Sequence, residues 1–210
     1  MSPGRTCTPP DSAQFRQYGP RRTLTMHRDT ACHQSPHHNR GALRVAFVYS
    51  ASGSREKKGG RPAAGVTGEN LQMALELLKV QAPSLFPSAD RYSYRITNAF
   101  MQPLARAQGD KRSEASATEI LDPQNIRRVT TEVKGCTIVV LCGNRPHLFA
   151  SDLRKQGVRV VEAAHTGNQG LVSKHNTPAA KCGTSPGSRR ELRAHAWAAA
   201  LLSSLHVDEA

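Results

Sequence analysis

The sequence predicts an α/β fold, a three-layer α/β/α sandwich around a central sheet of four mostly parallel strands. Residues 45–49 (VAFVY) and 136–141 (CTIVVL) are short apolar runs, which are typical of strands buried on both faces of a parallel sheet. Segments with helical periodicity separate the expected strands. Strands that alternate with helices favour a parallel sheet with helices on both faces.

The first half of the expected domain reads as strand, loop, helix and strand. The first strand is expected at residues 44–50, and a long loop of small and charged residues follows it. A helix is expected from Thr67, its expected N-cap, to Gln81. A second strand is expected at residues 91–98, where apolar and polar residues alternate. The polar residues 102–119 are expected to form a loop or a mobile insertion.

The second half continues the alternation. Helices are expected at residues 123–134 and 146–156, and strands at 136–141 and 158–163. Because the strand at 136–141 is wholly apolar, we expect it to be central in the sheet.

The C-terminal region is expected to hold one loop and one helix. Residues 165–187 are rich in Gly, Lys and Ser, which indicates a loop. The last helix is expected from Ser188 to about Leu205. Ser188 and Glu191 have the spacing of an S-x-x-E capping box.

The charge of the chain points to a polyanionic partner. Residues 1–42 contain five Pro and four His without periodicity, so we expect a disordered leader there and one domain at residues 43–210. The formal net charge is +13, of which the leader contributes +4 and the domain +9. A domain this basic favours nucleic acid as a partner. Solvated Lys and Arg side chains are the alternative explanation.

Several classes of protein are excluded by composition. No apolar run approaches the ~20 residues of a membrane span, and no apolar signal region follows the N-terminal charges. The five cysteines include no CxxC pair, which argues against a disulfide framework or a zinc site. We therefore expect a cytoplasmic, monomeric protein without a metal or cofactor.

Candidate site residues follow the expected strands at their carboxyl ends, where open α/β sheets bind ligands. These positions hold Ser50, Asn98 and His165. The amide of Asn98 offers donors and an acceptor that suit the edge of a nucleobase, although Asn is also a common turn residue. His165 begins a tight loop (HTGNQGL), where an ordinary hydrogen-bonded histidine is the alternative.

Three segments, taken in order, resemble the uracil-DNA glycosylase superfamily. The family's first motif, GEAPGxxE followed by GRPFxGxxGxLL, is similar to residues 49–56 (YSASGSRE) and 60–71 (GRPAAGVTGENL). Its middle motif, a strand that ends in TN, is similar to residues 95–99 (RITNA). Its last motif, HPSxxx(L/N), is similar to residues 165–171 (HTGNQGL). The resemblance covers residues 43–205 and implies the α/β/α fold of that family.

The resemblance implies that a base is flipped out of DNA and released by hydrolysis of its N-glycosidic bond. It implies that His165 donates a hydrogen bond to the base as negative charge develops on it, and that Asn98 reads the edge of the base. Ser50 is expected to place the water, helped by backbone N–H groups near Ala51 and Gly53. Because a hydroxyl is a poor general base, Glu56 is a further catalytic candidate.

Two positions depart from the family pattern. Ser50 stands where the family often has an acidic residue or Asn, and Ala63 stands where an aromatic ring stacks on uracil. Loss of that ring leaves space, so we expect a base bulkier than uracil, such as a modified cytosine of phage DNA. An enzyme of anti-phage defence would have this specificity. The four spaced cysteines of the family's iron–sulfur branch are absent, so no cluster is expected.

DNA binding is expected from basic residues after His165 and beside the first motif, which would neutralise backbone phosphates. Gln169 or Leu171 is expected to wedge into the gap left by the flipped base. The basic residues are Lys174, His175, Lys181, Arg189, Arg190 and Arg193, together with Lys57, Lys58 and Arg61.

Three other functions stay open at this point. Ser50 favours a non-catalytic DNA-binding module of the same fold. A hydrolase of small nucleotides is disfavoured by the charge of +9 on the domain. A uracil-excision repair enzyme is the nearest enzymatic alternative, and Ala63 argues against it.

Overall fold

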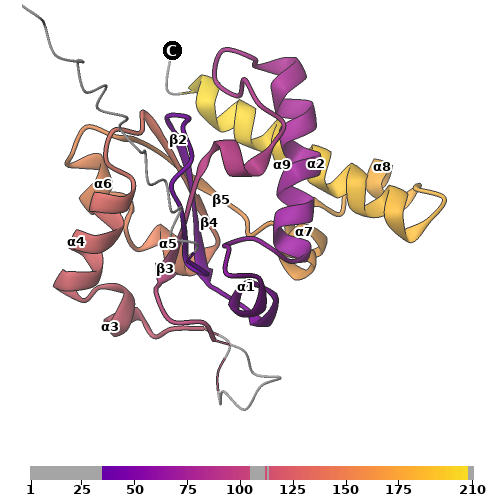
Figure 1. Cartoon of the computed structure of the whole chain (residues 1–210). Coiled ribbons are helices and arrows are strands. Elements are labelled where there is room, and N and C mark those ends of the chain that lie inside the picture. The colour runs from indigo at the N-terminus through magenta and orange to yellow at the C-terminus, as the bar shows by residue number, and fades with distance from the viewer. Residues whose placement is uncertain (1–34, 105–111, 113, 208–210) are drawn as a thin grey trace, which may run out of the picture. The chain divides into compact units, whose positions relative to one another are not determined.

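The computed structural model describes residues 35–104, 112 and 114–207, and these residues form a sheet with helices on both of its faces (Figure 1). The strand order is β1-β3-β2-β4-β5, and β1 runs antiparallel to β3 while the other neighbours are parallel. The predicted α/β class is confirmed, but the sheet has five strands rather than four. The strands are β1 (His38–Asn39), β2 (Val45–Ala51), β3 (Arg95–Phe100), β4 (Ile138–Cys142) and β5 (Arg159–Ala163).

Strand β1 lies in the stretch that the sequence analysis assigned to a disordered leader. His38 lies opposite Thr97 of β3, and the amide of Asn39 donates to the carbonyl oxygens of Tyr92 and Tyr94 at 3.0 and 2.7 Å. The folded part therefore includes residues 35–42. The rest of the expected leader, residues 1–34, lies outside the described residues.

The helices form two layers. In Figure 1, α4 and α6 lie on one side of the sheet, and α2 and α9 lie on the other. The helices are α1 (Ser54–Gly59), α2 (Val66–Gln81), α3 (Ala117–Ile120), α4 (Pro123–Glu132), α5 (Asn144–His147), α6 (Ala150–Arg154), α7 (Asn168–His175), α8 (Pro178–Lys181) and α9 (Pro186–Val207), with a 3-10 turn, η1, at Arg91–Ser93.

The largest differences from the expected elements fall in the loops. The expected loop at 50–67 contains α1, and the expected loop at 165–187 contains α7 and α8. The helix expected at 146–156 is two short helices, α5 and α6. The sequence does contain a signal for the start of α8, a threonine followed by proline. In the structure Thr177 is the N-cap and accepts a hydrogen bond from the Ala180 N–H.

Two helix starts also differ from the sequence-based expectation. Helix α2 begins after Gly65 rather than at Thr67. Helix α9 begins at Pro186, where Ser185 Oγ accepts the Ser188 N–H, so the expected capping box of Ser188 with Glu191 is wrong. A capping box is formed instead in the polar stretch 102–119, between Ser116 and Glu119 at the start of α3. Residues 105–111 and 113 of that stretch lie outside the described residues.

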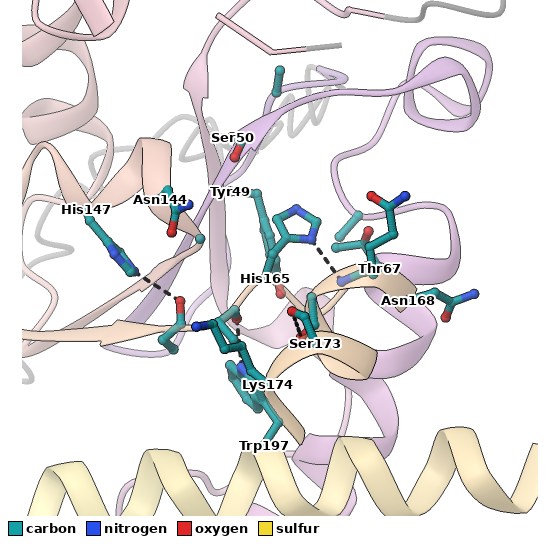
Figure 2. Close-up of a pocket in the computed structure, with 18 of the residues that line it drawn as sticks. Tyr49, Ser50, Thr67, Asn144, His147, His165, Asn168, Ser173, Lys174 and Trp197 are labelled. Atoms are coloured by element: carbon teal, nitrogen blue, oxygen red, sulfur yellow. Dashed lines mark hydrogen bonds between the residues drawn. The ribbon is translucent and has the colours of Figure 1, made fainter. Parts of the chain in front are cut away.

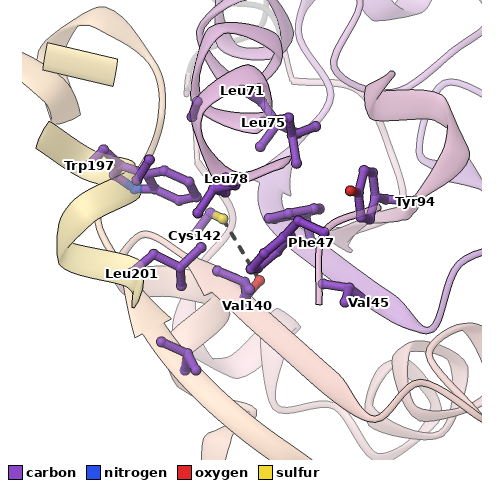
Figure 3. Packing of buried hydrophobic residues seen from close by; sticks show 14 of the residues in the cluster. Val45, Phe47, Leu71, Leu75, Leu78, Tyr94, Val140, Cys142, Trp197 and Leu201 are labelled. Carbon is purple, nitrogen blue, oxygen red and sulfur yellow. Dashed lines mark hydrogen bonds between the residues drawn. The ribbon is translucent and has the colours of Figure 1, made fainter. Parts of the chain in front are cut away.

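The larger core cluster lies between the sheet and the layer of α2 and α9 (Figure 3). Phe47 of β2 meets Tyr94 edge-on, with ring centroids 5.7 Å apart. Trp197 of α9 is 1% exposed, and Leu75 of α2 is fully buried. Because the apolar stripes of both helices meet this face of the sheet, they are held against it and against each other.

The second core cluster lies on the opposite face, under α4 and α6. It contains Val48 of β2, Leu141 of β4, Val129 of α4 and Leu153 of α6. All five residues of β4 are buried, and the strand lies between β2 and β5, so the predicted central position of this segment is confirmed. No helix within the described residues is long and apolar enough to cross a bilayer.

A polar cluster holds β1 and α4 to the edge of the sheet. Glu132 of α4 accepts hydrogen bonds from Thr97 and, at 2.6 Å, from Arg128, and His37 Nε2 lies 3.5 Å from its other oxygen. Burial alone would raise the pKa of Glu132, but these three partners outweigh burial and hold the pKa at about 2. The ionised carboxylate is therefore part of the folded state down to strongly acidic pH.

We expect Glu132→Gln to lower the free energy of unfolding at pH 7 by on the order of 3 kcal/mol. Because the pKa falls from 4.5 to about 2 on folding, this stabilisation is complete above pH 4.5 and is lost as the pH falls toward 2. Urea unfolding of both proteins between pH 7 and 2.5 measures the difference. Glu76→Gln, on an exposed residue of α2, is the matched control. A difference that does not change with pH would contradict the assignment.

Candidate functional site

A cavity of about 1030 Å³ opens at the carboxyl edge of the sheet (Figure 2). Its wall includes Ser50 at the end of β2, Asn98 of β3, Gly143 after β4 and His165 after β5. Four strand ends that are far apart in sequence therefore share one cavity, as their positions in the sequence suggested.

His165 is held as a neutral imidazole. Its Nδ1 accepts a hydrogen bond of 2.9 Å from the Gly167 N–H, so the ring hydrogen is on Nε2. Burial lowers the pKa of His165 below its ordinary value of 6.5, and the carboxylates of Glu114 and Glu56 oppose this shift only in part. The Nε2 side of the ring points away from the Gly167 loop (Figure 2). The site therefore presents a neutral N–H donor.

The loop after His165 requires two glycines. A Cβ on Gly167 would lie 2.8 Å from the Nδ1 that its own N–H binds, and a Cβ on Gly170 would lie 2.0 Å from the His165 carbonyl oxygen. Any side chain at either position would displace the imidazole or its backbone. The HTGNQGL segment is thus built around the orientation of one ring.

A buried hydrogen-bond network also holds the loop that follows His165. The Tyr49 hydroxyl lies 3.0 Å from Thr166 Oγ1, which donates to the Thr67 carbonyl oxygen. The amide of Asn70, fully buried in α2, donates to the Thr166 carbonyl oxygen at 2.6 Å and accepts from Arg190 Nε. Strand β2, α2 and α9 thereby hold the backbone next to His165.

Asn98 is 2% exposed and lies opposite Tyr49 in the register of β2 and β3. Its amide donates to Ser52 Oγ at 2.6 Å, and Ser52 donates to the Pro36 carbonyl oxygen at 2.5 Å. The Asn98 backbone N–H donates to the carbonyl oxygen of His37. The side chain is therefore oriented, and within the described residues its Oδ1 has no hydrogen-bond partner.

Glu56 lines the cavity, but its carboxylate joins two helices. One oxygen accepts the Gly53 N–H before α1 and the other accepts the Gly65 N–H before α2, both at 3.1 Å. Both carboxylate oxygens of Glu56 are therefore occupied by backbone N–H donors at the starts of the two helices. The Gly53 N–H, which was expected to help place the water, donates to Glu56.

Ser50 and Ala51, the last two residues of β2, line the cavity. Within the described residues, the Ser50 hydroxyl has no hydrogen-bond partner, and Figure 2 shows it on the side of the cavity above His165. Glu114 is an exposed carboxylate of the cavity wall that the sequence analysis missed, because it lies in a polar stretch without a motif. Glu114 lies 3.5 Å from Arg145 Nε.

Ala63 contributes only a methyl group to the wall of the cavity. It is 5% exposed and has a φ of +51°, a conformation that costs a non-glycine residue about 1–2 kcal/mol. Gly68 of α2 lies so close that a Cβ there would be 1.7 Å from the Ala63 carbonyl oxygen. The close approach of these two backbone segments holds the methyl group of Ala63 at the cavity wall.

Five of the expected DNA-binding residues divide into three groups. Lys174 and Gln169 are exposed residues of α7 that line the cavity. Lys181 of α8 and Arg189 of α9 lie outside it. Leu171 is 1% exposed and belongs to the larger core cluster, so it cannot wedge into DNA from this position.

A further part of the cavity wall was not expected from the sequence. It is lined by Trp197 and Leu201 of α9 and by Glu162 of β5. His147 of α5 lies there too, with Nε2 3.1 Å from the carbonyl oxygens of both Leu141 and Ala163. These residues lie within helices or strands, whereas the candidate residues were sought at strand ends and in loops, so the sequence did not single them out.

No protein-family model matches the sequence, and no curated protein matches it either. Within the described ranges, no group of three or more His, Cys, Asp or Glu side chains is placed to hold a metal ion. Function is therefore inferred from the cavity residues and their chemistry.

Proposed function

We propose that this protein is a DNA glycosylase that removes a modified pyrimidine bulkier than uracil and leaves an abasic site. The observation that carries the proposal is the neutral His165, whose Nδ1 accepts the Gly167 N–H and leaves Nε2–H as a donor in a cavity with Asn98 and Ser50. We further propose a cytoplasmic protein that acts as a monomer on DNA.

In this reaction the bond between C1′ and the base nitrogen breaks, and its electron pair leaves with the base. The Nε2–H of His165 would donate to the base oxygen on which this charge collects. A fixed donor in a buried site stabilises such charge more than water does. The two glycines and the buried network keep the donor in place, so little reorganisation is needed as the bond breaks.

Asn98 would bind the edge of the base through its Oδ1, because its amide hydrogen bond to Ser52 sets the orientation of the side chain. Ser50 would hold the water that adds to C1′. Since Glu56 is engaged by two backbone N–H groups, the proton released by this water would pass to Glu114 or to solvent.

The size of the cavity favours a bulky base. Its volume of about 1030 Å³ is just above the usual ~300–1,000 Å³ of small-molecule sites, and a bare pyrimidine would leave most of it empty. Ala63 adds room, because an aromatic ring at that position would occupy this space. Such a ring would also stack on the base, a contact worth ~1–3 kcal/mol. A cytosine with a large substituent, as in phage DNA, has the matching size.

Matched duplex oligonucleotides that contain uracil, plain cytosine or a bulky modified cytosine at one position test the proposal. We expect alkali-labile abasic sites only in the modified duplex. Preferential release of uracil would show instead a uracil-excision repair enzyme. Binding without any abasic site would show a non-catalytic DNA-binding module, for which the engaged carboxylate of Glu56 is the specific argument.

The pH dependence of base release is expected to follow His165. Protonation would place an N–H on Nδ1 opposite the Gly167 N–H and would break their hydrogen bond. Because burial lowers the pKa of His165 below 6.5, the neutral, active form persists to more acidic pH. We expect kcat to be constant from pH 8 to 6.5 and to fall only below that range. A midpoint at or above 6.5 would contradict the neutral donor.

A further inference from the structure

A second concave surface lies beside the cavity, at the start of α9, and it is lined by three arginines. We call it the arginine groove. It has a volume of about 490 Å³ and consists of Asn168, Val172, Pro186, Gly187, Arg189, Arg190 and Arg193. Asn168 lines both the groove and the cavity, so the two sites are adjacent.

The groove presents donors to solvent. Within the described residues, the guanidinium of Arg189 has no hydrogen-bond or ion-pair partner, and Arg193 uses only its Nε, which donates to Asn176 at 3.1 Å. Space is open at Gly187, where an added Cβ would meet only Ser185 Oγ within 4 Å, at 3.8 Å. Asn168 accepts from Asn70 at 3.4 Å through its oxygen, and within the described residues its amide hydrogens have no acceptor.

The third arginine, Arg190, is held in place by hydrogen bonds to α2. Arg190 donates to Glu69 at 2.7 Å and also to Asn70. Glu69, an acidic residue of α2, also lies 3.5 Å from Arg55. One carboxylate thus serves two arginines, and among the described residues no carboxylate lies within ion-pair distance of Arg189 or Arg193.

This placement of charge is unfavourable for the helix alone. Cations near a helix N-terminus oppose its macrodipole, and like charges at positions i and i+4, as in Arg189 and Arg193, repel each other. The first turn of α9 contains no acidic residue to offset them. An anion in the groove would remove both penalties, and arginine side chains bind phosphate oxygens through paired N–H groups.

We infer that the arginine groove binds a phosphodiester of the DNA strand whose nucleotide enters the cavity. The inference rests on the proposed function for its choice of DNA as the ligand. Because Asn168 separates the two sites, a strand that places a base beside His165 would carry a neighbouring phosphate to α9. The groove then sets which strand enters and in which register.

The test is binding of a fluorescein-labelled duplex of unmodified sequence, measured by anisotropy over a range of salt concentrations. The Arg189→Ala, Arg193→Ala double variant is expected to lower the log–log salt slope by about one for each lost contact. The control double variant, Arg127→Ala with Lys155→Ala, removes the same charge from exposed residues on the other side of the sheet. An unchanged slope in the groove variant, or an equal decrease in the control, would overturn the inference.

Two further measurements identify the source of the phosphate and check the fold. Pyrophosphate at matched ionic strength should displace DNA only at concentrations far above that of the duplex, because it occupies the groove alone whereas DNA makes further phosphate contacts. Displacement at a concentration comparable to that of the duplex would reassign the groove to a free phosphate ligand. The thermal midpoint of the groove variant should be unchanged or higher, since a repulsion is removed. The binding assay needs no base release, so an unchanged salt slope in the groove variant would refute only the arginine groove. Absence of abasic sites would refute only the proposed glycosylase activity.

A scan with single methylphosphonates tests the register on the modified duplex. Neutralising one phosphate beside the target nucleotide should weaken binding by the wild-type protein and have no effect on the groove variant. Equal losses in both proteins at every position would contradict a contact between the groove and that strand.

Discussion

His165→Ala is expected to reduce kcat for base release by about 10²- to 10³-fold, the usual effect of removing one preorganised donor to a developing anion. Binding of DNA should change little, because the donor acts mainly on charge that appears as the bond breaks. Single-turnover release from the modified duplex and anisotropy with the same duplex measure the two effects separately.

Two controls distinguish this loss from a folding defect. His206→Ala changes an exposed histidine at the end of α9 and should leave kcat unchanged. Added imidazole should restore part of the rate of His165→Ala by entering the space of the missing ring. Full activity of His165→Ala would remove His165 from the chemistry, and with it the main support for the proposed function.

Trp197→Ala is expected to lower the free energy of unfolding by about 3–5 kcal/mol. The ring is 1% exposed in the larger core cluster, and its Nε1–H donates to the Ala164 carbonyl oxygen at 2.8 Å (Figure 3). The change opens a void between α9 and the sheet and also frees the residue before His165. Urea unfolding at pH 7 measures the loss.

Two variants separate packing from hydrogen bonding at this position. Trp197→Phe keeps most of the ring but leaves the Ala164 carbonyl oxygen without its donor, which is expected to cost about 1–3 kcal/mol. Val80→Ala alters an apolar residue that is 78% exposed and should change stability by less than about 0.5 kcal/mol. A loss in Trp197→Ala no larger than in Trp197→Phe would contradict the packing role.

The sequence was informative where polar residues end apolar runs. Ser50 and His165 each follow such a run, and Asn98 ends the alternating segment 91–98. Parallel pairing brings these three positions to one edge of the sheet. Their common cavity was therefore predictable without coordinates. The same reasoning identified the α/β class and the central position of β4.

The rest depended on contacts between distant segments. Strand β1 has only two residues and is held by pairing with β3 across more than fifty positions of chain. Leu171 reads as a loop residue until α7 packs it into the core. The capping role of Glu56 depends on Gly65, which meets it only once α1 and α2 have formed.

Strand β1 has a consequence for any shortened version of this protein. A chain trimmed to begin at Leu43 would lose the backbone contacts of Pro36 and His37 with Ser52 and Asn98. It would also uncover the ladder groups of β3, and an open strand edge is a template for self-association. Such a truncation would be prone to aggregate, and the side chain of Asn98 would lose its support at the same time.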